Sequence, residues 1–448
     1  MRIVEGAEEA RNTLLKRLPL EEPELPAAVR ETNRRVFGAE LGAAEVVDRI
    51  LRDVRSDGDA AIRRYNEALD GVSAPDAPLE VSADEIKAAY AEVEDGLVES
   101  LRFAAARIQA FHELQLVHAS TSFVSDGVGQ AVRPIARVGL YVPGTRVIYP
   151  STLLMTAIPA RVAGVAELIV ATPANPDGSV APLKLVAAEI AGVDRVFRAG
   201  GVQGIGALAY GTESVPAVDK ICGPGNIFVT IAKKKLFGEV GIDGIFGPSE
   251  TLVVADKDAD PSLVAADMLA GAEHEELATA VLITDSRDLA ERVSEAVDRQ
   301  LASLDRAEVI RTSLDARGGA VVASSLDEAL DLASDFAAEH ACLHLREAAR
   351  YIDRIRNAGC IFAGASSAES IGDYTAGPSH VMPTGGSAKF ASPIGVHDFL
   401  KITSTVSITA ESAREIGPAG ALIARAEGFG GHANAIEARI SSEGDEEA

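Results

Sequence analysis

The residues in this chain best suited to chemistry are two glutamate–histidine pairs. Glu339 and His340 lie in the stretch "DFAAEHACLHL", and Glu273 and His274 lie in "LAGAEHEE", in a chain with only eight histidines. A histidine has a pKa near neutrality, so it serves as a base for proton transfer, and a neighbouring carboxylate can tune it. The same side chains also bind metal ions. The pairs are therefore metal ligands, an acid and a base, or chance neighbours in an acidic, alanine-rich sequence.

The histidines gather toward the C-terminus, which favours a site over scattered surface residues. Six of the eight lie after residue 270: His274, His340, His344, His380, His397 and His432. His274 ends a predicted helix, whereas His380 and His432 lie in the loop-like stretches "AGPSHVMPTGG" and "EGFGGHANA", so distant segments could assemble a metal site. Taken singly, His344 and His397 are better explained as surface or core residues.

Two glycine-rich turns are candidates for binding a nucleotide. In "GVQGIGALAYG", Gly204, Gly206 and Ala209 follow a predicted strand and open a helix, as a dinucleotide-binding turn requires. Glycines in such a turn also occur for packing alone. In "CGPGN", residues 222–226, backbone N–H groups could face an anion, or the segment is an ordinary tight turn.

The elements that position these residues follow a βαβ pattern. From about residue 137, short β-branched runs alternate with alanine-rich helical stretches, as in "ELIVATP", "VDKICGPGN", "TLVVAD", "TAVLITD" and "GCIFAG". This pattern predicts an α/β protein with two doubly wound parallel sheets. Helices predominate before it, where Val47, Ile50, Leu51 and Val54 share one helix face. The polar, glycine-containing stretch after Gly364 is expected to be a functional loop.

Composition limits the partners and the location of the protein. The chain has 448 residues, 47% of them hydrophobic, which predicts more than one domain. A net charge of −25 repels phosphate backbones, so we expect no nucleic acid partner. Charges interrupt every apolar stretch near the start, so we expect no secretory signal and no membrane span there. The three cysteines are widely spaced, which suggests free thiols in a reducing compartment, so we expect a cytoplasmic protein. The acidic excess suggests either adaptation to high salt or an ordinary acidic enzyme.

Several long stretches make the chain resemble the histidinol dehydrogenase family. They include "QGIGALAYGTESVPAVDKICGPGN", "GIDGIFGPSETLVVAD", "AADMLAGAEH", "AAEH", "IGDYTAGPSHVMPTGG" and "AEGFGGHANA", in the order that the family shows. The resemblance implies an NAD-dependent, zinc-containing homodimer that oxidises L-histidinol through an enzyme-held aldehyde to L-histidine. It also implies two incomplete Rossmann-like domains with small helical segments at both ends.

Carried over motif by motif, the resemblance implies a role for each matching residue. Glu339 and His340 are the catalytic pair, with His340 the base for the alcohol and Glu339 activating the water that hydrates the aldehyde. We expect both on a helix, where neighbours point in different directions, so that they act separately on one substrate. The zinc ligands, which hold the substrate's imidazole and amine, are His274, Asp373 and His432. The further substrate-contacting residues are Ser249, His380 and Glu427, and the NAD-contacting residues are Tyr141, Gln203 and Asn226.

The expected domains are a helical segment over residues 1–33, a discontinuous first Rossmann-like domain over 34–140 and 249–390, and a second over 141–248. The C-terminal segment 391–448, with Glu427 and His432, is expected to complete the neighbouring subunit's site. One departure from the family concerns the metal: the family has a glutamine ligand where this chain has Gly271. Water could fill the vacancy, or the pocket is reshaped for another polar or amino alcohol. A noncatalytic binding protein that kept the fold is the remaining alternative.

Overall fold

The computed structural model describes residues 1–17, 25–74, 77–144 and 148–441. The chain divides into two compact units, the first formed by Met1–Val117 with Ile135–Phe399 and the second by His118–Pro134 with Leu400–Ala448. The first unit holds two parallel sheets, as the alternating strand and helix pattern predicts. Parts of the expected terminal segments, residues 18–24 and 442–448, lie outside the described residues.

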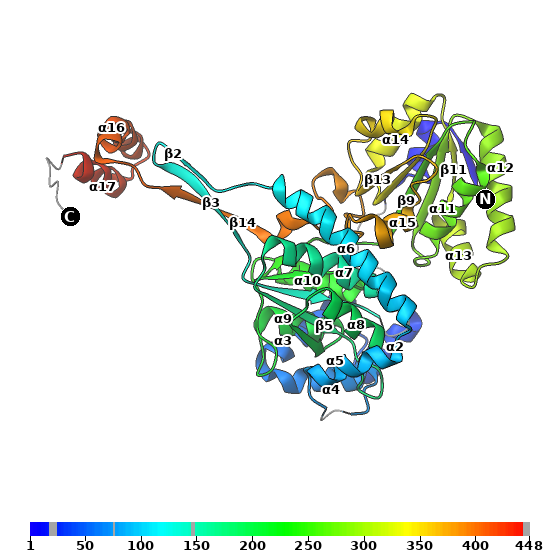
Figure 1. Ribbon diagram of the computed structural model, residues 1–448, viewed down its shortest axis with the longest axis horizontal. Helices are drawn as coiled ribbons and strands as arrows, with labels where there is room; N and C mark the ends of the chain where they lie inside the picture. The colour runs from blue at the N-terminus through cyan, green and yellow to red at the C-terminus, as the bar shows by residue number, and fades with distance from the viewer. Residues whose placement is uncertain (18–24, 75–76, 145–147, 442–448) are drawn as a thin grey trace. The chain divides into compact units, whose positions relative to one another are not determined.

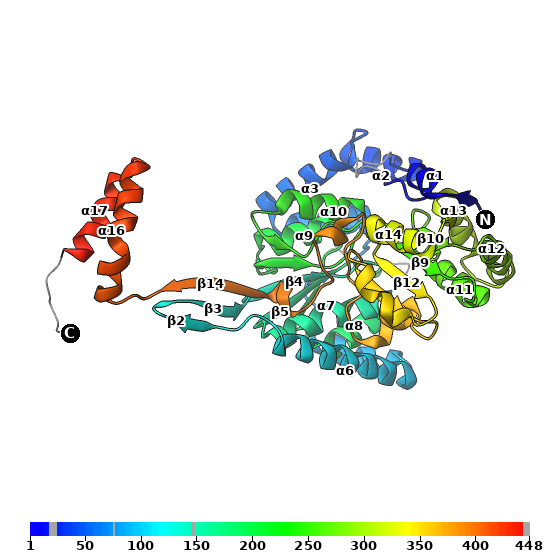
Figure 2. The ribbon, with the colours of Figure 1, turned by 90° about the horizontal axis from the view of Figure 1, so that it is seen from above.

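The first parallel sheet has five strands in the order β6-β5-β4-β7-β8. Its strands are β4 (Arg137–Tyr141), β5 (Glu167–Thr172), β6 (Arg195–Arg198), β7 (Lys220–Cys222) and β8 (Gly241–Ile242). The helices between them are α7 (Pro150–Ala163), α8 (Pro182–Ile190), α9 (Gly201–Tyr210) and α10 (Ile227–Leu236). Figure 2 shows α9 and α10 on one face and α7 and α8 on the other. Strand order reverses beside β4, which opens a crevice at the carboxyl ends of the strands.

The helices of residues 27–117 pack around the five-stranded sheet, largely against its own helices. They are α2 (Ala27–Phe37), α3 (Ala43–Asp57), α4 (Asp59–Asp70), α5 (Ala83–Ala89) and α6 (Asp95–Val117), with the short turn η1 (Tyr90–Glu92). The predicted apolar face of α3 is buried in one core with Phe197, Ile205 and Leu208. The sequence analysis grouped this region with residues 249–390 instead. Helical spacing identifies a buried face, but it carries no information about which sheet covers that face.

The second parallel sheet has six strands in the order β1-β11-β10-β9-β12-β13. Its strands are β1 (Ile3–Glu5), β9 (Glu250–Ala255), β10 (Thr279–Thr284), β11 (Gly319–Val322), β12 (His340–His344) and β13 (Cys360–Ala363). Along β9, Leu252 and Val254 enter one core while Val253 and Ala255 enter the other, so both faces are covered. The N-terminal segment, expected to be helical, thus also supplies strand β1 beside its helix α1 (Ala7–Asn12).

Helices cover both faces of the six-stranded sheet (Figure 1). They are α11 (Pro261–Ala272), α12 (Arg287–Leu301), α13 (Ala307–Arg317) and α14 (Leu326–Phe336). The remaining short helical turns are η2 (Ala348–Arg354), α15 (Glu369–Ile371), the π-helical turn η3 (Gly372–Ala376), η4 (Ser387–Lys389) and η5 (Val396–Phe399). The stretch after Gly364, expected to be a loop, therefore contains short turns that hold polar side chains in place.

The second unit combines a small sheet with two helices. Strands β2 (Phe123–Ser125), β3 (Val128–Pro134) and β14 (Leu400–Val406) form an antiparallel sheet in the order β14-β3-β2. Helices α16 (Ala410–Ala426) and α17 (Gly430–Ile440) bury Ala421, Ala424 and Ala433 between them. Across both units, no helix within the described ranges is long and apolar enough to cross a membrane.

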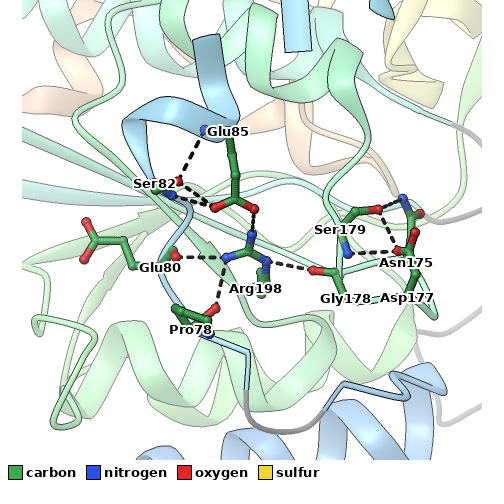
Figure 3. Close-up of polar contacts among 9 residues, drawn as sticks. All are labelled: Pro78, Glu80, Ser82, Glu85, Asn175, Asp177, Gly178, Ser179 and Arg198. Atoms are coloured by element: carbon green, nitrogen blue, oxygen red, sulfur yellow. Dashed lines mark hydrogen bonds and ion pairs between the residues drawn. The ribbon is translucent and has the colours of Figure 1, made fainter. Parts of the chain in front are cut away.

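A buried arginine anchors the segment between α4 and α5 to the end of β6 (Figure 3). The guanidinium of Arg198 donates to the carbonyls of Pro78, Glu80 and Gly178 at 2.8 to 2.9 Å and pairs with the carboxylate of Glu85. Because the side chain is only 6% exposed, these backbone acceptors replace its water. These contacts fix residues 78–85 against β6.

Candidate active site

One cavity of the first unit collects most of the residues singled out in the sequence. Its volume is about 630 Å³, within the range of small-molecule sites. Of the predicted site residues, it is lined by Tyr141, Asn226, Ser249, His274, Glu339, His340, Asp373 and His380. These residues come from both sheets and from the turns after Gly364, so the cavity brings together segments that are far apart in the chain.

Glu339 and His340 lie at the start of a strand, so the expectation that they share a helix was wrong. Helix α14 ends at Phe336, Ala337 takes a left-handed conformation with φ 56°, and β12 begins at His340. Neighbours at a strand start also point in different directions. Glu339 Oε2 accepts hydrogen bonds from Ser249 Oγ at 2.7 Å and from the backbone N–H of Glu250 at 3.1 Å.

The His340 ring is buried among carboxylates. Its Nδ1 lies 3.7 Å from Glu369 Oε1 and 3.8 Å from Glu339 Oε2, and its Nε2 lies 3.4 Å from Asp373 Oδ1. Among the described residues, neither ring nitrogen has a hydrogen-bond partner. Burial lowers the pKa of His340, but the carboxylates of Glu369, Glu339 and Asp373 outweigh burial and raise the pKa to about 10. At this pKa the ring carries a proton near neutral pH, and a cation that neutralised Glu369 and Asp373 would lower the pKa toward that of a proton acceptor.

Three side chains at the cavity have the arrangement of a metal site. His274, Glu369 and Asp373 each offer one ligand atom, and these atoms lie within 4.8 Å of one another. Glu369 is 1% and Asp373 9% exposed, and Glu369 Oε1 and Asp373 Oδ1 lack a hydrogen-bond partner in the described part of the chain. Buried carboxylate oxygens without partners are costly unless a cation neutralises them, and nitrogen and oxygen donors suit zinc. The residues present therefore fit the metal that the sequence analysis expected.

The sequence analysis did not identify Glu369. The signal was present in "ESIGDY", because Glu369 and Asp373 are four residues apart and thus share one face of a helical turn. The structure places them on the consecutive turns α15 and η3. Burial raises the pKa of Glu369 to about 7.

His380 is held at the cavity by the same turn. Its Nδ1 lies 2.8 Å from the backbone carbonyl of Asp373, and its Nε2 lies 3.3 Å from Thr152 Oγ1. A carbonyl oxygen can only accept, so Nδ1 carries the proton in this contact and Nε2 accepts from the Thr152 hydroxyl. Burial lowers the pKa of His380, which keeps the ring neutral.

Two of the three residues expected to contact NAD line the cavity. The hydroxyl oxygen of Tyr141 accepts from the Gly201 N–H at 2.9 Å, and Asn226 caps α10 by accepting from the N–H groups of residues 228 and 229. Gln203, in contrast, is 1% exposed and lies behind the wall, where its Nε2 donates to Asp70 Oδ2 at 3.0 Å. Asp70 lines the cavity instead, and burial raises its pKa to about 6.

The glycines of the first predicted nucleotide turn serve packing. A Cβ at Gly204 would lie 2.3 Å from the carbonyl oxygen of Ala199, and one at Gly206 would lie 3.2 Å from Leu51 on α3. The packing explanation therefore holds for these two residues, whereas the turn of residues 224–226 lines the cavity.

The remaining two predicted residues belong to the second unit. Glu427 caps the C-terminus of α16, and the His432 ring stacks on Phe429 with centroids 5.1 Å apart. Both are exposed. Their roles at the site stay predictions.

Comparison with known proteins identifies the family of the chain. A model of the histidinol dehydrogenase family matches residues 34–440. The chain is 49% identical over 443 residues to the histidinol dehydrogenase of Deinococcus radiodurans, covering 98% of this chain and 100% of that protein. It is also 49% identical over 415 residues to that of Moorella thermoacetica, covering 92% and 98% respectively. The crystal structure of histidinol dehydrogenase from Elizabethkingia anophelis matches with a TM-score of 0.88 at 32% identity, covering 98% of each chain. This chain therefore belongs to the histidinol dehydrogenase family.

Proposed function

We propose that the protein oxidises L-histidinol to L-histidine in two steps, each using one NAD. The observation that carries this proposal is one cavity that joins the buried pair Glu339 and His340 to the His274–Glu369–Asp373 group. Family membership supports the substrate. Bound NAD supplies the hydride acceptor, and bound zinc supplies an anchor for the imidazole and amine of the substrate.

The chain's own residues account for the proton transfers. Loss of a hydride from an alcohol requires removal of its hydroxyl proton, and His340, at the cavity wall, is the acceptor in its neutral form. The aldehyde must be hydrated before a second hydride can leave. Glu339 activates the water, because burial raises its pKa and its Oε2 is fixed by Ser249 and the Glu250 N–H. His340 then takes the proton of the hydrate, so one base serves both oxidations.

For the cofactors, the residues that would hold NAD are Tyr141, Gln203 and Asn226, and those that would hold zinc include His274, Asp373 and His432. The cavity wall contains Tyr141, Asn226, His274 and Asp373. In this proposal Gln203 acts from behind the wall, through Asp70.

The proposal includes a homodimer in which Glu427 and His432 of one subunit complete the other subunit's site. Mixing a His340→Gln variant with a His432→Gln variant tests this arrangement. Each variant alone is inactive, but a mixed dimer regains one intact site of its two, so about a quarter of the wild-type activity should return. If activity does not return although mixed dimers form, the shared site is refuted.

Counting NADH on L-histidinol tests the activity. We expect two NADH and one L-histidine for each L-histidinol consumed. No NADH would refute the proposal. The second candidate, a family member acting on another polar or amino alcohol, is favoured by Gly271 in place of the family's glutamine. A single NADH per molecule, or faster turnover of another alcohol in a substrate panel, would support that candidate instead.

A further inference from the structure

Glu369 is a buried carboxylate that the proposed proton transfers leave unused. It is 1% exposed, and its Oε2 accepts a hydrogen bond from Thr251 Oγ1 at 2.7 Å. Its Oε1 has no hydrogen-bond partner among the described residues, although an ionised carboxylate can accept several. One oxygen is therefore held in place, the other has no partner in the described part of the chain, and the carboxylate lies in a group with Asp373 and His274.

Gly271 packs against Thr251, the residue that holds the Glu369 carboxylate. A Cβ at residue 271 would lie 2.1 Å from Thr251 Oγ1 and 2.5 Å from Thr251 Cβ. Helix α11 thus packs so closely on β9 that Thr251 fills the space beside residue 271. A side chain at residue 271 would therefore clash with Thr251, whose hydroxyl is directed to Glu369.

We propose that Glu369 is a metal ligand in this protein and replaces the glutamine that the family has at residue 271. Thr251 is a positioning residue, because its hydroxyl holds the ligand's other oxygen. The inference rests on the proposed zinc site. Two carboxylates with one neutral imidazole offset the charge of a divalent cation fully, whereas a set with glutamine and one carboxylate leaves a positive charge.

An alternative role for Glu369 is electrostatic only, because its Oε1 lies 3.7 Å from His340 Nδ1. In that case Glu369 would influence proton transfer but not metal retention. The two roles differ in a property that needs no catalysis, namely the affinity of the substrate-free protein for zinc.

The test is zinc affinity, measured on the full-length protein by competition with a chelator and by elemental analysis after dialysis. Glu369→Gln keeps the size of the side chain and removes its charge. We expect zinc affinity to fall by more than ~100-fold. Glu339→Gln is the matched control, because it makes the same change at another buried carboxylate of the cavity that lies outside the metal group, and it should retain zinc as the wild type does. If Glu369→Gln binds zinc as tightly as the wild type, the inference is overturned.

A second variant addresses the positioning role and covers the case in which Glu369→Gln does not fold. Thr251→Val keeps the shape that packs against Gly271 and removes the hydroxyl, so zinc affinity should fall by about 10- to 100-fold. The absorption spectrum of the cobalt-substituted protein should change as well, since the orientation of a ligand changes. Unaltered affinity and spectrum would count against the inference. These readouts use no L-histidinol, so they can succeed where the proposed activity fails, and the reverse.

Discussion

Gly271→Ala should destabilise the protein, although helix propensity predicts the opposite. Gly271 lies within α11, where alanine is favoured over glycine by ~1 kcal/mol. The new methyl group, however, would lie 2.1 Å from Thr251 Oγ1 and 2.5 Å from Thr251 Cβ. Thr251 cannot move aside easily, because β9 is paired with β10 and β12 on its two edges. Overpacking of this kind costs up to ~3 kcal/mol, so we expect a net loss of ~2 kcal/mol.

Urea unfolding followed by circular dichroism measures this effect, with Gly96→Ala as the control. Gly96 lies near the start of α6, and a Cβ there meets nothing closer than Glu94 Oε1 at 3.7 Å. The control should gain up to ~1 kcal/mol. A Gly271→Ala protein that is more stable than the wild type would refute the close packing of α11 on β9, and with it our explanation of the missing glutamine.

Three further predictions concern other buried groups. Glu339→Gln should slow the oxidation of L-histidinaldehyde by ~100-fold or more and slow the oxidation of L-histidinol less. The rate of NADH formation from each substrate measures this difference, and equal losses of rate for the two substrates would contradict the role assigned to Glu339. Burial raises the pKa of Asp70 to about 6 in the folded protein, above its value in the unfolded chain, so its contribution to stability is present below pH ~4 and is lost as pH rises through 6. Asp70→Asn should therefore be ~1–3 kcal/mol more stable than the wild type at pH 8 and not at pH 4, and urea titrations that show no pH-dependent difference would contradict this. Arg198→Met should lower the free energy of unfolding by ~3–5 kcal/mol, because it leaves buried carbonyl acceptors unpaired. The control Arg195→Met, at a half-exposed pair with Glu80, should lower it by ~1 kcal/mol or less. Similar unfolding midpoints for the two variants would refute the anchoring role of Arg198.

The two parallel sheets could be predicted because their strands carry a strong local signal. Runs such as "TLVVAD" are buried on both faces and therefore consist almost entirely of apolar residues. Strands β2, β3 and β14 gave no such signal, because their side chains are mostly exposed and none forms a continuous apolar run. The partner of α3 was also beyond prediction, since a buried face fits any apolar surface.

Most of the site could be predicted from motifs, but its details depend on contacts across the fold. The role of Glu369 follows from Thr251 on β9 and Gly271 on α11, which meet only in the folded protein. Gln203 shows the same limit, because a motif identifies the turn but not which side chain faces the cavity. The resemblance placed Glu339 and His340 at one site and both line one cavity, although their local structure was predicted wrongly.

Diffraction at the zinc absorption edge, from crystals of the full-length protein grown with zinc and L-histidinol, tests the central claim most directly. We expect an anomalous peak within bonding distance of His274, Glu369 and Asp373, with the substrate's imidazole at the peak and its alcohol carbon near His340. A zinc peak elsewhere in the molecule, or L-histidinol bound away from His340, would refute the proposed site.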